Sequence, residues 1–219
     1  MAASNIITAD GSHTIKNEPF DELYHSERGA VMESLHVFIG AGFQQISSSH
    51  VNVYEVGFGT GLNALLTLLE AQKTGKTVYY ETVELYPISL ESASTLNFTQ
   101  QLGVENGLFL QLHSCPWNEE VAITPYFTVR KIRQDATLYK PLKLFNVVYF
   151  DAFSCNTQPE LWTEGLFTLI YNSLITSGLL VTYSSKGLVK QALRTAGFTV
   201  KRLPGAGGKR HMVRAVKLT

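Results

Sequence analysis

One segment, VNVYEVGFGTGLN at residues 51–63, limits the folds open to this chain more than any other. Its apolar, β-branched residues stop at Gly57, Gly59 and Gly61, and a helix-like pattern follows. This order predicts a strand, a tight turn and a helix, which is the opening of a nucleotide-cofactor site. The glycines would let the backbone of the turn approach a ligand at the helix N-terminus.

The spacing of the glycines indicates the kind of cofactor. A dinucleotide site has G-x-G-x-x-G, whereas this turn has G-x-G-x-G, with Glu55 two residues before it. A carboxylate at that place would repel a pyrophosphate and would pair with an ammonium group. We therefore expect a cofactor with a cationic amino-acid end, and S-adenosylmethionine fits. A purely structural turn and an NAD site are the alternatives.

Length and composition favour one globular domain. The chain has 219 residues, of which 45% are hydrophobic and 16% charged, so it can bury a sizeable core. No apolar run approaches the roughly 20 residues of a membrane span, and the N-terminus lacks a signal-peptide pattern. Cys115 and Cys155 have neither metal-ligand nor disulfide spacing. We expect a cytoplasmic protein with reduced thiols, no membrane association and no metal.

The net charge of zero hides an uneven distribution. All 18 acidic residues lie at or before Glu164, whereas half of the 18 Lys and Arg residues follow it. Distant segments of opposite charge can interleave in the fold. Alternatively, the basic segment forms a face for a phosphate backbone.

Strand and helix patterns alternate after residue 50. The predicted strands are 51–56, 77–85, 108–112, 127–133, 144–150, 179–184, 198–203 and 211–217. The predicted helices are 29–43, 62–73, 87–102, 159–176 and 187–195. Alternation predicts a parallel sheet covered on both faces, with an antiparallel hairpin at the end.

We therefore expect an α/β, Rossmann-like class I S-adenosylmethionine-dependent methyltransferase. Its sheet would have seven strands, mostly parallel, with a C-terminal antiparallel hairpin. Residues 1–50 are expected to be an N-terminal extension packed on the core and residues 51–219 the methyltransferase domain, together a single domain.

Four acidic residues fall at successive predicted strand ends, where ligands bind in a doubly wound sheet. Glu55 lies beside the glycine turn, and Glu84 is placed to accept hydrogen bonds from ribose hydroxyls. Asp135 is within reach of an adenine amino group, and Asp151 lies beside the expected point of methyl transfer. A single such acid is more often a helix cap or a solvated loop residue. Four of them together with the turn favour a site.

The acceptor decides which base is needed. An amine must be neutral when it attacks, and Asp151 could orient it and take its proton. A hydroxyl or thiol would need a stronger base, for which His25, His36 and His113 are candidates, although each is more often a packed or surface histidine. Cys155 is interpreted as a structural thiol.

Two loops are expected on the acceptor side. Residues 150–162 follow the strand that ends at Asp151 and are expected to shape the acceptor pocket. The glycine-rich loop 204–211 could present Lys209 and Arg210 to phosphate, or it could simply end a hairpin.

Several segments match one known family. They are FDELYHSERGAVMESLHVFI (20–39), EVGFGTGLN (55–63), VELYPIS (83–89), FDAF and QPELW within 150–162, GLLVTYSSKGLVKQALRTAGFTVKR (178–202) and GGKRHM (207–212). With these segments the chain resembles the methyltransferase domain of MnmC, the bifunctional tRNA 5-methylaminomethyl-2-thiouridine biosynthesis protein, and its stand-alone relatives. The FDELY block and the basic tail are not general methyltransferase features.

The resemblance implies a reaction and a partner. The reaction would move a methyl group from S-adenosylmethionine to the 5-aminomethyl group of the tRNA wobble uridine, converting 5-aminomethyl-2-thiouridine to 5-methylaminomethyl-2-thiouridine. Asp151 falls on the aspartate of the family's motif after the catalytic strand, and Asp135 on its acidic residue near the adenine. The residues that fall on the family's cofactor loop are Glu55, Gly57, Gly59, Gly61 and Asn63. The residues placed on the tRNA side are Tyr24, Phe153, Lys209 and Arg210.

The chain departs from the family in three places. The family's bifunctional members carry a further FAD-dependent oxidase domain, for which this chain ends too soon, so a separate protein is expected to supply the aminomethyl precursor. Residues 155–158 replace the family's Pro-Ala-Lys-Asn stretch, and Gly208 and His211 replace an arginine and an acid. The alternatives are a methyltransferase or aminopropyltransferase for a small amine or another RNA, or a non-catalytic cofactor- or RNA-binding module.

Overall fold

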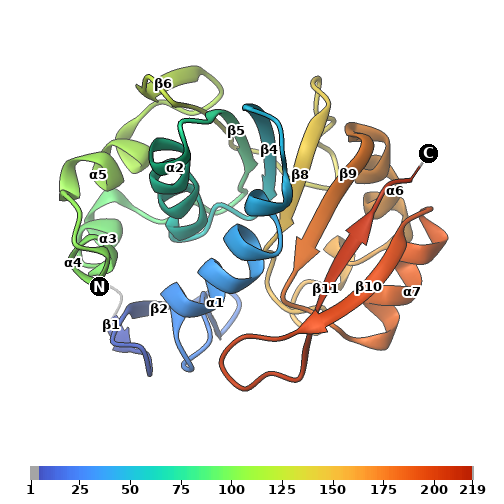
Figure 1. The fold of residues 1–219 in the computed structure, drawn as a ribbon. Coiled ribbons are helices and arrows are strands. Elements are labelled where there is room, and N and C mark those ends of the chain that lie inside the picture. Colours follow the sequence, from blue (N-terminus) through green and yellow to red (C-terminus); the bar gives the residue numbers. More distant parts are fainter. Residues whose placement is uncertain (1–4, 219) are drawn as a thin grey trace.

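The computed structural model describes residues 5–218 and contains two sheets (Figure 1). The large sheet has eight strands in the order β10-β11-β9-β8-β4-β5-β7-β6. Their bounds are β4 His50–Val56, β5 Thr77–Val83, β6 Glu120–Thr124, β7 Phe127–Ile132, β8 Phe145–Phe150, β9 Leu174–Thr182, β10 Thr199–Pro204 and β11 His211–Val216. The small sheet has the order β1-β2-β3, with β1 Asn5–Ile7, β2 His13–Asn17 and β3 Glu22–Leu23.

The large sheet contains seven of the eight predicted strand segments, all except 108–112, and one strand that was not predicted. Strands β7, β5, β4, β8 and β9 are parallel, and the C-terminal hairpin β10–β11 joins β9 in antiparallel orientation. The additional strand, β6, pairs antiparallel with β7 at the far edge. The predicted count of seven was therefore one too low. The segment EVAIT that forms β6 has Val121 and Ile123 at alternate positions, but it is a five-residue edge strand with one buried residue, and it was not predicted.

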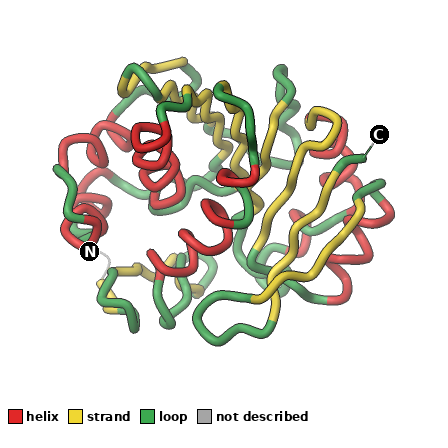
Figure 2. The backbone as a smooth tube through the Cα atoms, viewed as in Figure 1, coloured by secondary structure: helices red, strands yellow, loops and turns green. Residues whose placement is uncertain are grey.

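Helices cover both faces of this sheet (Figure 2). Consecutive residues of β4 point to opposite faces: Val53 packs in one core with Leu65 of α2 (Leu62–Thr74), and Tyr54 in the other with Phe167 of α6 (Glu164–Ser173). Helix α7 (Gly187–Thr195) has the bounds predicted from the sequence and lies next to α6. Burial on both faces explains why the central strands are almost continuously apolar.

The N-terminal segment packs on the same core as α2. After the small sheet come α1 (Ala30–Ser34), the π-helix η1 (Leu35–Gly40) and the short 3-10 helix η2 (Phe43–Gln45). Ile15 of β2 and Phe38 of η1 are buried in the α2 core. The sequence analysis placed a helix here but did not predict the small sheet.

Two predicted elements were wrong, and two others have different bounds. Residues 108–112 form part of helix α5 (Asn106–Ser114), because Phe109 and Leu112, three residues apart, are the buried side chains. The single helix expected at 87–102 is two, α3 (Leu90–Ser94) and α4 (Phe98–Leu102). The helix expected at 159–176 is η3 (Pro159–Leu161) followed by α6, and β9 begins earlier than predicted.

Candidate active site

A cavity of about 610 Å³ lies where β4, β5 and β8 end. Parallel strands meet there at their carboxyl ends, so the residues that follow each strand face a common space. The predicted site residues that line it are Gly57, Gly59, Glu84, Asp135, Asp151, Tyr24, Phe153 and Lys209. Four others, Glu55, Gly61, Asn63 and Arg210, are not among its lining residues.

The glycine turn is packed so closely that side chains are excluded. A Cβ on Gly57 would lie 2.7 Å from the backbone oxygen of Asp151, and one on Gly61 would lie 2.7 Å from Nε2 of His113. Both glycines also have positive φ, +92° and +75°, which L side chains rarely adopt. Gly61 thus supports the turn from behind, at the N-cap of α2.

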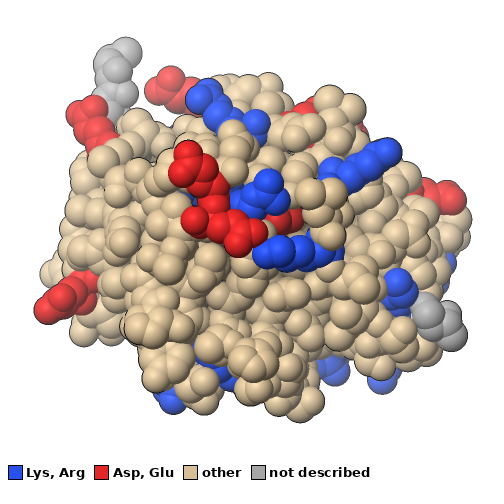
Figure 3. Space-filling view, turned by 90° about the horizontal axis from the view of Figure 1, so that it is seen from above, with Lys and Arg blue, Asp and Glu red and all other residues tan. Residues whose placement is uncertain are grey.

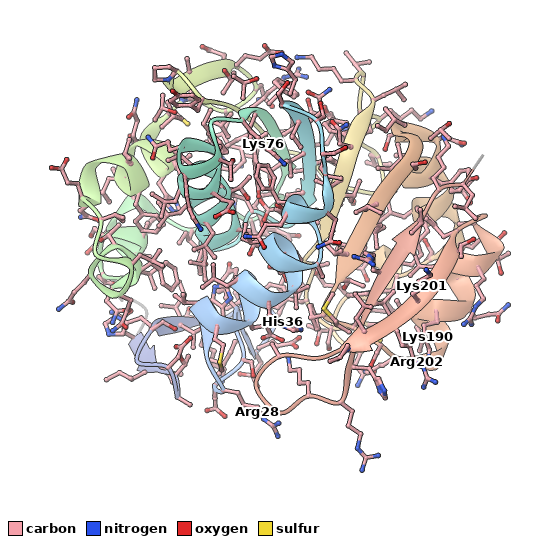
Figure 4. All side chains as sticks on the ribbon, viewed as in Figure 1. Arg28, His36, Lys76, Lys190, Lys201 and Arg202 are labelled. Carbon is pink, nitrogen blue, oxygen red and sulfur yellow. The ribbon has the colours of Figure 1, made fainter. Side chains whose placement is uncertain are left out.

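Two histidines hold the turn at Thr60. His25 Nε2 lies 2.6 Å from the hydroxyl of Thr60, and His113 Nε2 donates to the Thr60 carbonyl at 3.0 Å. Burial lowers the pKa of each imidazole to about 4, so both are neutral at pH 7. These two candidate bases are therefore already engaged in holding the cofactor turn. The third, His36, is exposed, with Nε2 2.8 Å from the backbone oxygen of Pro204 (Figure 4).

Glu84 is tied to the same turn. Its Oε2 accepts a hydrogen bond from the Gly59 amide at 3.1 Å, and its Oε1 accepts one from the Tyr86 amide at 2.8 Å. Burial raises its pKa, and these amides oppose that shift. Asp135 lines the cavity and also accepts from the amide and hydroxyl of Thr137, at 2.8 and 2.7 Å. It thus both stabilises its own turn and faces the cavity.

Asn63 joins two carboxyl groups. Its Nδ2 donates to Asp151 Oδ2 at 2.7 Å and to Glu55 Oε1 at 3.1 Å. Burial, and then the charge of Asp151, raise the pKa of Glu55 well above its usual value. Glu55 is 1% exposed and lies behind the turn. It does not line the cavity but is linked to Asp151 through Asn63, and its Oε2 is buried without a hydrogen-bond partner among the described residues. The ammonium contact expected for Glu55 stays a prediction.

Asp151 has a fixed position at the cavity and a raised pKa. It follows β8, and its amide donates to the carbonyl of Val56 at 3.0 Å, which fixes it beside the glycine turn. Burial raises the pKa of its carboxyl to about 7, while the Asn63 hydrogen bond and the Lys209 charge oppose the shift. A group with a pKa near the working pH can both take and return a proton.

Lys209 lines the cavity and is partly exposed. Its Nζ forms a 2.5 Å ion pair with Glu33 of α1 and lies 5.2 Å from the ring centroid of Tyr183. Arg210, its neighbour, is exposed. The phosphate contacts expected for these two residues stay predictions. Glu33 was not among the predicted site residues: it lies within the matched segment 20–39, but nothing in that segment singles it out, and its partner is 176 residues away.

An aromatic wall closes the acceptor side. The ring of Phe153 lies 5.2 Å from that of Phe20 and 5.0 Å from that of Tyr24. The backbone of Phe153 is fixed on both sides, because its amide donates to Gln158 Oε1 at 3.1 Å and its carbonyl accepts from Trp162 Nε1 at 2.8 Å. Residues 150–162 thus hold Phe153 rigidly at the cavity. Cys155 in this loop is a buried free thiol.

The basic C-terminal segment is largely unpaired. Among the residues described, Lys209 is the one Lys or Arg after Glu164 that forms an ion pair with an acid. Lys190 of α7 and Lys201 and Arg202 of β10 gather on one side of the molecule (Figure 4). On the face in Figure 3, by contrast, Lys and Arg lie beside Asp and Glu. Opposite charges thus mix on that face.

Residues 5–218 include no helix whose length and hydropathy would let it span a bilayer. In the same range, no three His, Cys, Asp or Glu side chains are grouped to hold a metal ion.

The chain is similar to known methyltransferases. Residues 117–218 match the family model described as S-adenosyl-L-methionine-dependent methyltransferase. The tRNA 5-methylaminomethyl-2-thiouridine biosynthesis bifunctional protein MnmC of Legionella pneumophila (strain Lens) is 28% identical over 89% of this chain and 34% of its own length. The MnmC protein of Magnetococcus marinus is 30% identical over 90% of this chain and 31% of its own length. The chain thus spans about a third of the curated relatives it matches.

A solved structure extends the similarity to the fold. MnmC2 from Aquifex aeolicus superposes with a TM-score of 0.76 and 27% identity, covering 98% of this chain and 70% of that protein. Spermidine synthase from Thermotoga maritima, at 16% identity and a TM-score of 0.56, shares the fold alone. The predicted resemblance is confirmed: the chain is similar along most of its length to MnmC proteins and has the Rossmann-like class I fold, and S-adenosylmethionine is the cofactor of the methyltransferases it matches.

Proposed function

We propose that this chain is an S-adenosylmethionine-dependent N-methyltransferase that acts on the 5-aminomethyl group of the tRNA wobble uridine. The observation that supports it most is one cavity that brings the glycine turn and Asp151 together. The relatives that match most of the chain are named for biosynthesis of the methylated nucleoside. The proposal includes action in the cytoplasm and a separate protein that supplies the aminomethyl group.

The cavity fits the cofactor. A volume of about 610 Å³ lies in the range of small-molecule sites. Gly57 and Gly59 would hold the amino-acid end, Glu84 the ribose and Asp135 the adenine. Bound there, S-adenosylmethionine supplies a methyl group on a positively charged sulfur.

Asp151 would prepare the acceptor. An aminomethyl group is mostly protonated at neutral pH and has no free lone pair. A carboxylate with a pKa of about 7 can remove one proton from the ammonium and leave a neutral nitrogen. Asn63 fixes the orientation of this carboxylate, so the proton is taken at a defined place. Phe153 and Tyr24 offer aromatic faces against which a nucleobase could stack.

The basic side of the molecule suits a polyanion. Lys201 and Arg202 lie on β10, in the hairpin whose loop contributes Lys209 to the cavity, and Lys190 lies on the same side of the molecule (Figure 4). Arg28 lies on the other side of that loop and donates to the carbonyl of Gly207 at 3.1 Å. A tRNA that delivers its anticodon loop to the cavity could rest its backbone on this side.

The proposal is tested by incubating the full chain with labelled S-adenosylmethionine and tRNA from cells that lack the wobble methylation. We expect label in the wobble uridine, detected by nucleoside mass spectrometry. If a folded protein that binds the cofactor leaves that uridine unlabelled, the tRNA assignment is wrong. Parallel reactions with small amines and with other RNA test a different acceptor.

A further inference from the structure

We propose that Glu33 and Tyr183 form a binding subsite for the protonated primary amine of the acceptor, and that Lys209 occupies this subsite when no acceptor is bound. The inference rests on the proposed function for its substrate and goes further in assigning a second carboxylate to the acceptor. In this arrangement Glu33 binds the amine and Asp151 takes its proton.

The subsite already holds an alkylammonium group. Lys209 Nζ lies 2.5 Å from Glu33 Oε1 and 5.2 Å from the centroid of the Tyr183 ring. A carboxylate and an aromatic face are the two groups that recognise an ammonium ion in proteins. Both line the same cavity as Asp151. An aminomethyl group ends in the same –CH2–NH3+ unit as a lysine side chain, so it can make the same contacts.

The subsite is rigid on the protein side. The hydroxyl of Tyr183 donates to the carbonyl of Ala152 at 2.9 Å, which ties it to the residue after Asp151. The side chain of Glu33 is only 14% exposed. Because water reaches this carboxylate poorly, an ion pair here gains more than it would on the surface.

Lys209 is the exchangeable part. Its side chain is 34% exposed, and it comes from the loop between β10 and β11. An incoming amine would replace Lys209 at Glu33 without leaving a buried carboxylate unpaired, and Lys209 would be released toward solvent, where a phosphate can bind it. The same exchange selects against acceptors without an amine, since a neutral group cannot displace a lysine ammonium from a carboxylate.

The test compares two nucleosides that differ in one group, 5-aminomethyluridine and 5-hydroxymethyluridine. Their affinities are measured by calorimetry on the full chain saturated with S-adenosylhomocysteine. We expect the wild type to prefer the amine by about tenfold or more. Glu33→Gln should remove most of this preference while its affinity for S-adenosylhomocysteine stays within twofold. Glu18→Gln, a change of an exposed acid that does not line the cavity, is the matched control and should keep the preference.

Removing Lys209 gives an effect of opposite sign. Lys209→Met should tighten binding of 5-aminomethyluridine several-fold, because the competing ammonium is gone, and leave the hydroxymethyl analogue unaffected. If the Lys209–Glu33 ion pair were only structural, Lys209→Met would weaken the binding of both nucleosides or of neither. The inference is overturned if Glu33→Gln keeps the amine preference, or if Lys209→Met weakens amine binding.

The outcomes separate this inference from the proposed function. If wild type methylates the wobble uridine and Glu33→Gln keeps the amine preference, the subsite is wrong and the function stands. If tRNA is not methylated but the preference depends on Glu33, the subsite stands and the tRNA assignment is wrong.

Discussion

The two ends of the cavity are built in different ways. The end assigned to the cofactor is built around one short continuous turn, which side chains from other segments hold in place: His25 and His113 contact Thr60, and Glu84 accepts a hydrogen bond from the Gly59 amide. The end assigned to the acceptor consists of side chains from distant segments, and Glu33 and Lys209 are 176 residues apart. One end is thus centred on a continuous segment of the chain, whereas the other is made wholly of side chains that the fold brings together.

This difference suggests how such enzymes can vary. A turn that excludes side chains fixes one ligand and tolerates little change. Charged side chains on separate segments can be exchanged one at a time without disturbing the sheet. The following predictions test whether the two ends are as separable as their construction indicates.

The largest effect is expected for Asp151→Asn. Loss of the proton acceptor should lower kcat by about 10²–10⁴-fold, while affinity for S-adenosylmethionine changes little. In the wild type the rate should rise with pH through about 7, as the Asp151 carboxyl ionises. Steady-state kinetics from pH 5.5 to 9 measure both effects. A parallel loss of cofactor affinity would show that the two ends are not separable.

Next in size is the effect of filling the turn. Gly61→Ala adds a Cβ 2.7 Å from His113 Nε2 at a φ of +75°, and should cost about 2–4 kcal/mol of unfolding free energy. Gly75→Ala is a matched control, because its φ is +69° and nothing lies within 4 Å; it should cost about 1 kcal/mol. Urea unfolding gives both values. Equal costs would mean that the contact with His113 is unimportant.

A smaller effect is expected from acid. His113 has a pKa of about 4 when folded and about 6.5 when unfolded. Between these values the unfolded state binds the proton first, so stability falls as pH falls from about 6.5 to about 4. In His113→Gln, the loss of unfolding free energy between pH 7 and pH 4.5 should be smaller than in the wild type by about 1–3 kcal/mol. The carboxyl groups with raised pKa values make the protein more stable as pH falls, which is the opposite effect. Because these groups are the same in the variant and the wild type, their contribution cancels when the two proteins are compared at pH 7 and pH 4.5. Identical slopes would contradict the neutral buried imidazole.

The smallest effect is expected on the basic side. Lys201→Gln with Arg202→Gln should weaken tRNA binding several-fold and reduce the slope of log affinity against log salt by about one to two. Lys140→Gln, an exposed lysine in the acidic part of the chain, is the control. Filter binding at 50–300 mM salt measures the slopes. A salt slope unchanged from wild type would exclude these side chains as phosphate contacts.

The sequence predicted the cofactor end better than the acceptor end because the main part of the cofactor end is continuous in the chain. The strand β4, the glycine turn and α2 are consecutive, so period and glycine spacing indicate them directly. Nothing within the matched segment 20–39 singles out Glu33, because its partner is a lysine near the other end of the chain. Residues 108–112 were misjudged because LFLQL suits a strand as well as a helix, and only packing of Phe109 and Leu112 decides between them. The apolar alternation in the C-terminal hairpin was a local signal, and that hairpin was predicted correctly.

The contact between His25 and Thr60 has a consequence for motion. His25 follows the small N-terminal sheet, so opening of that sheet would withdraw one of the two groups that hold the turn. By linkage, a ligand that binds the ordered turn also favours the closed N-terminal segment. Backbone amides of β2 and β3 should therefore exchange with deuterium more slowly when cofactor is bound, although most of them do not touch it.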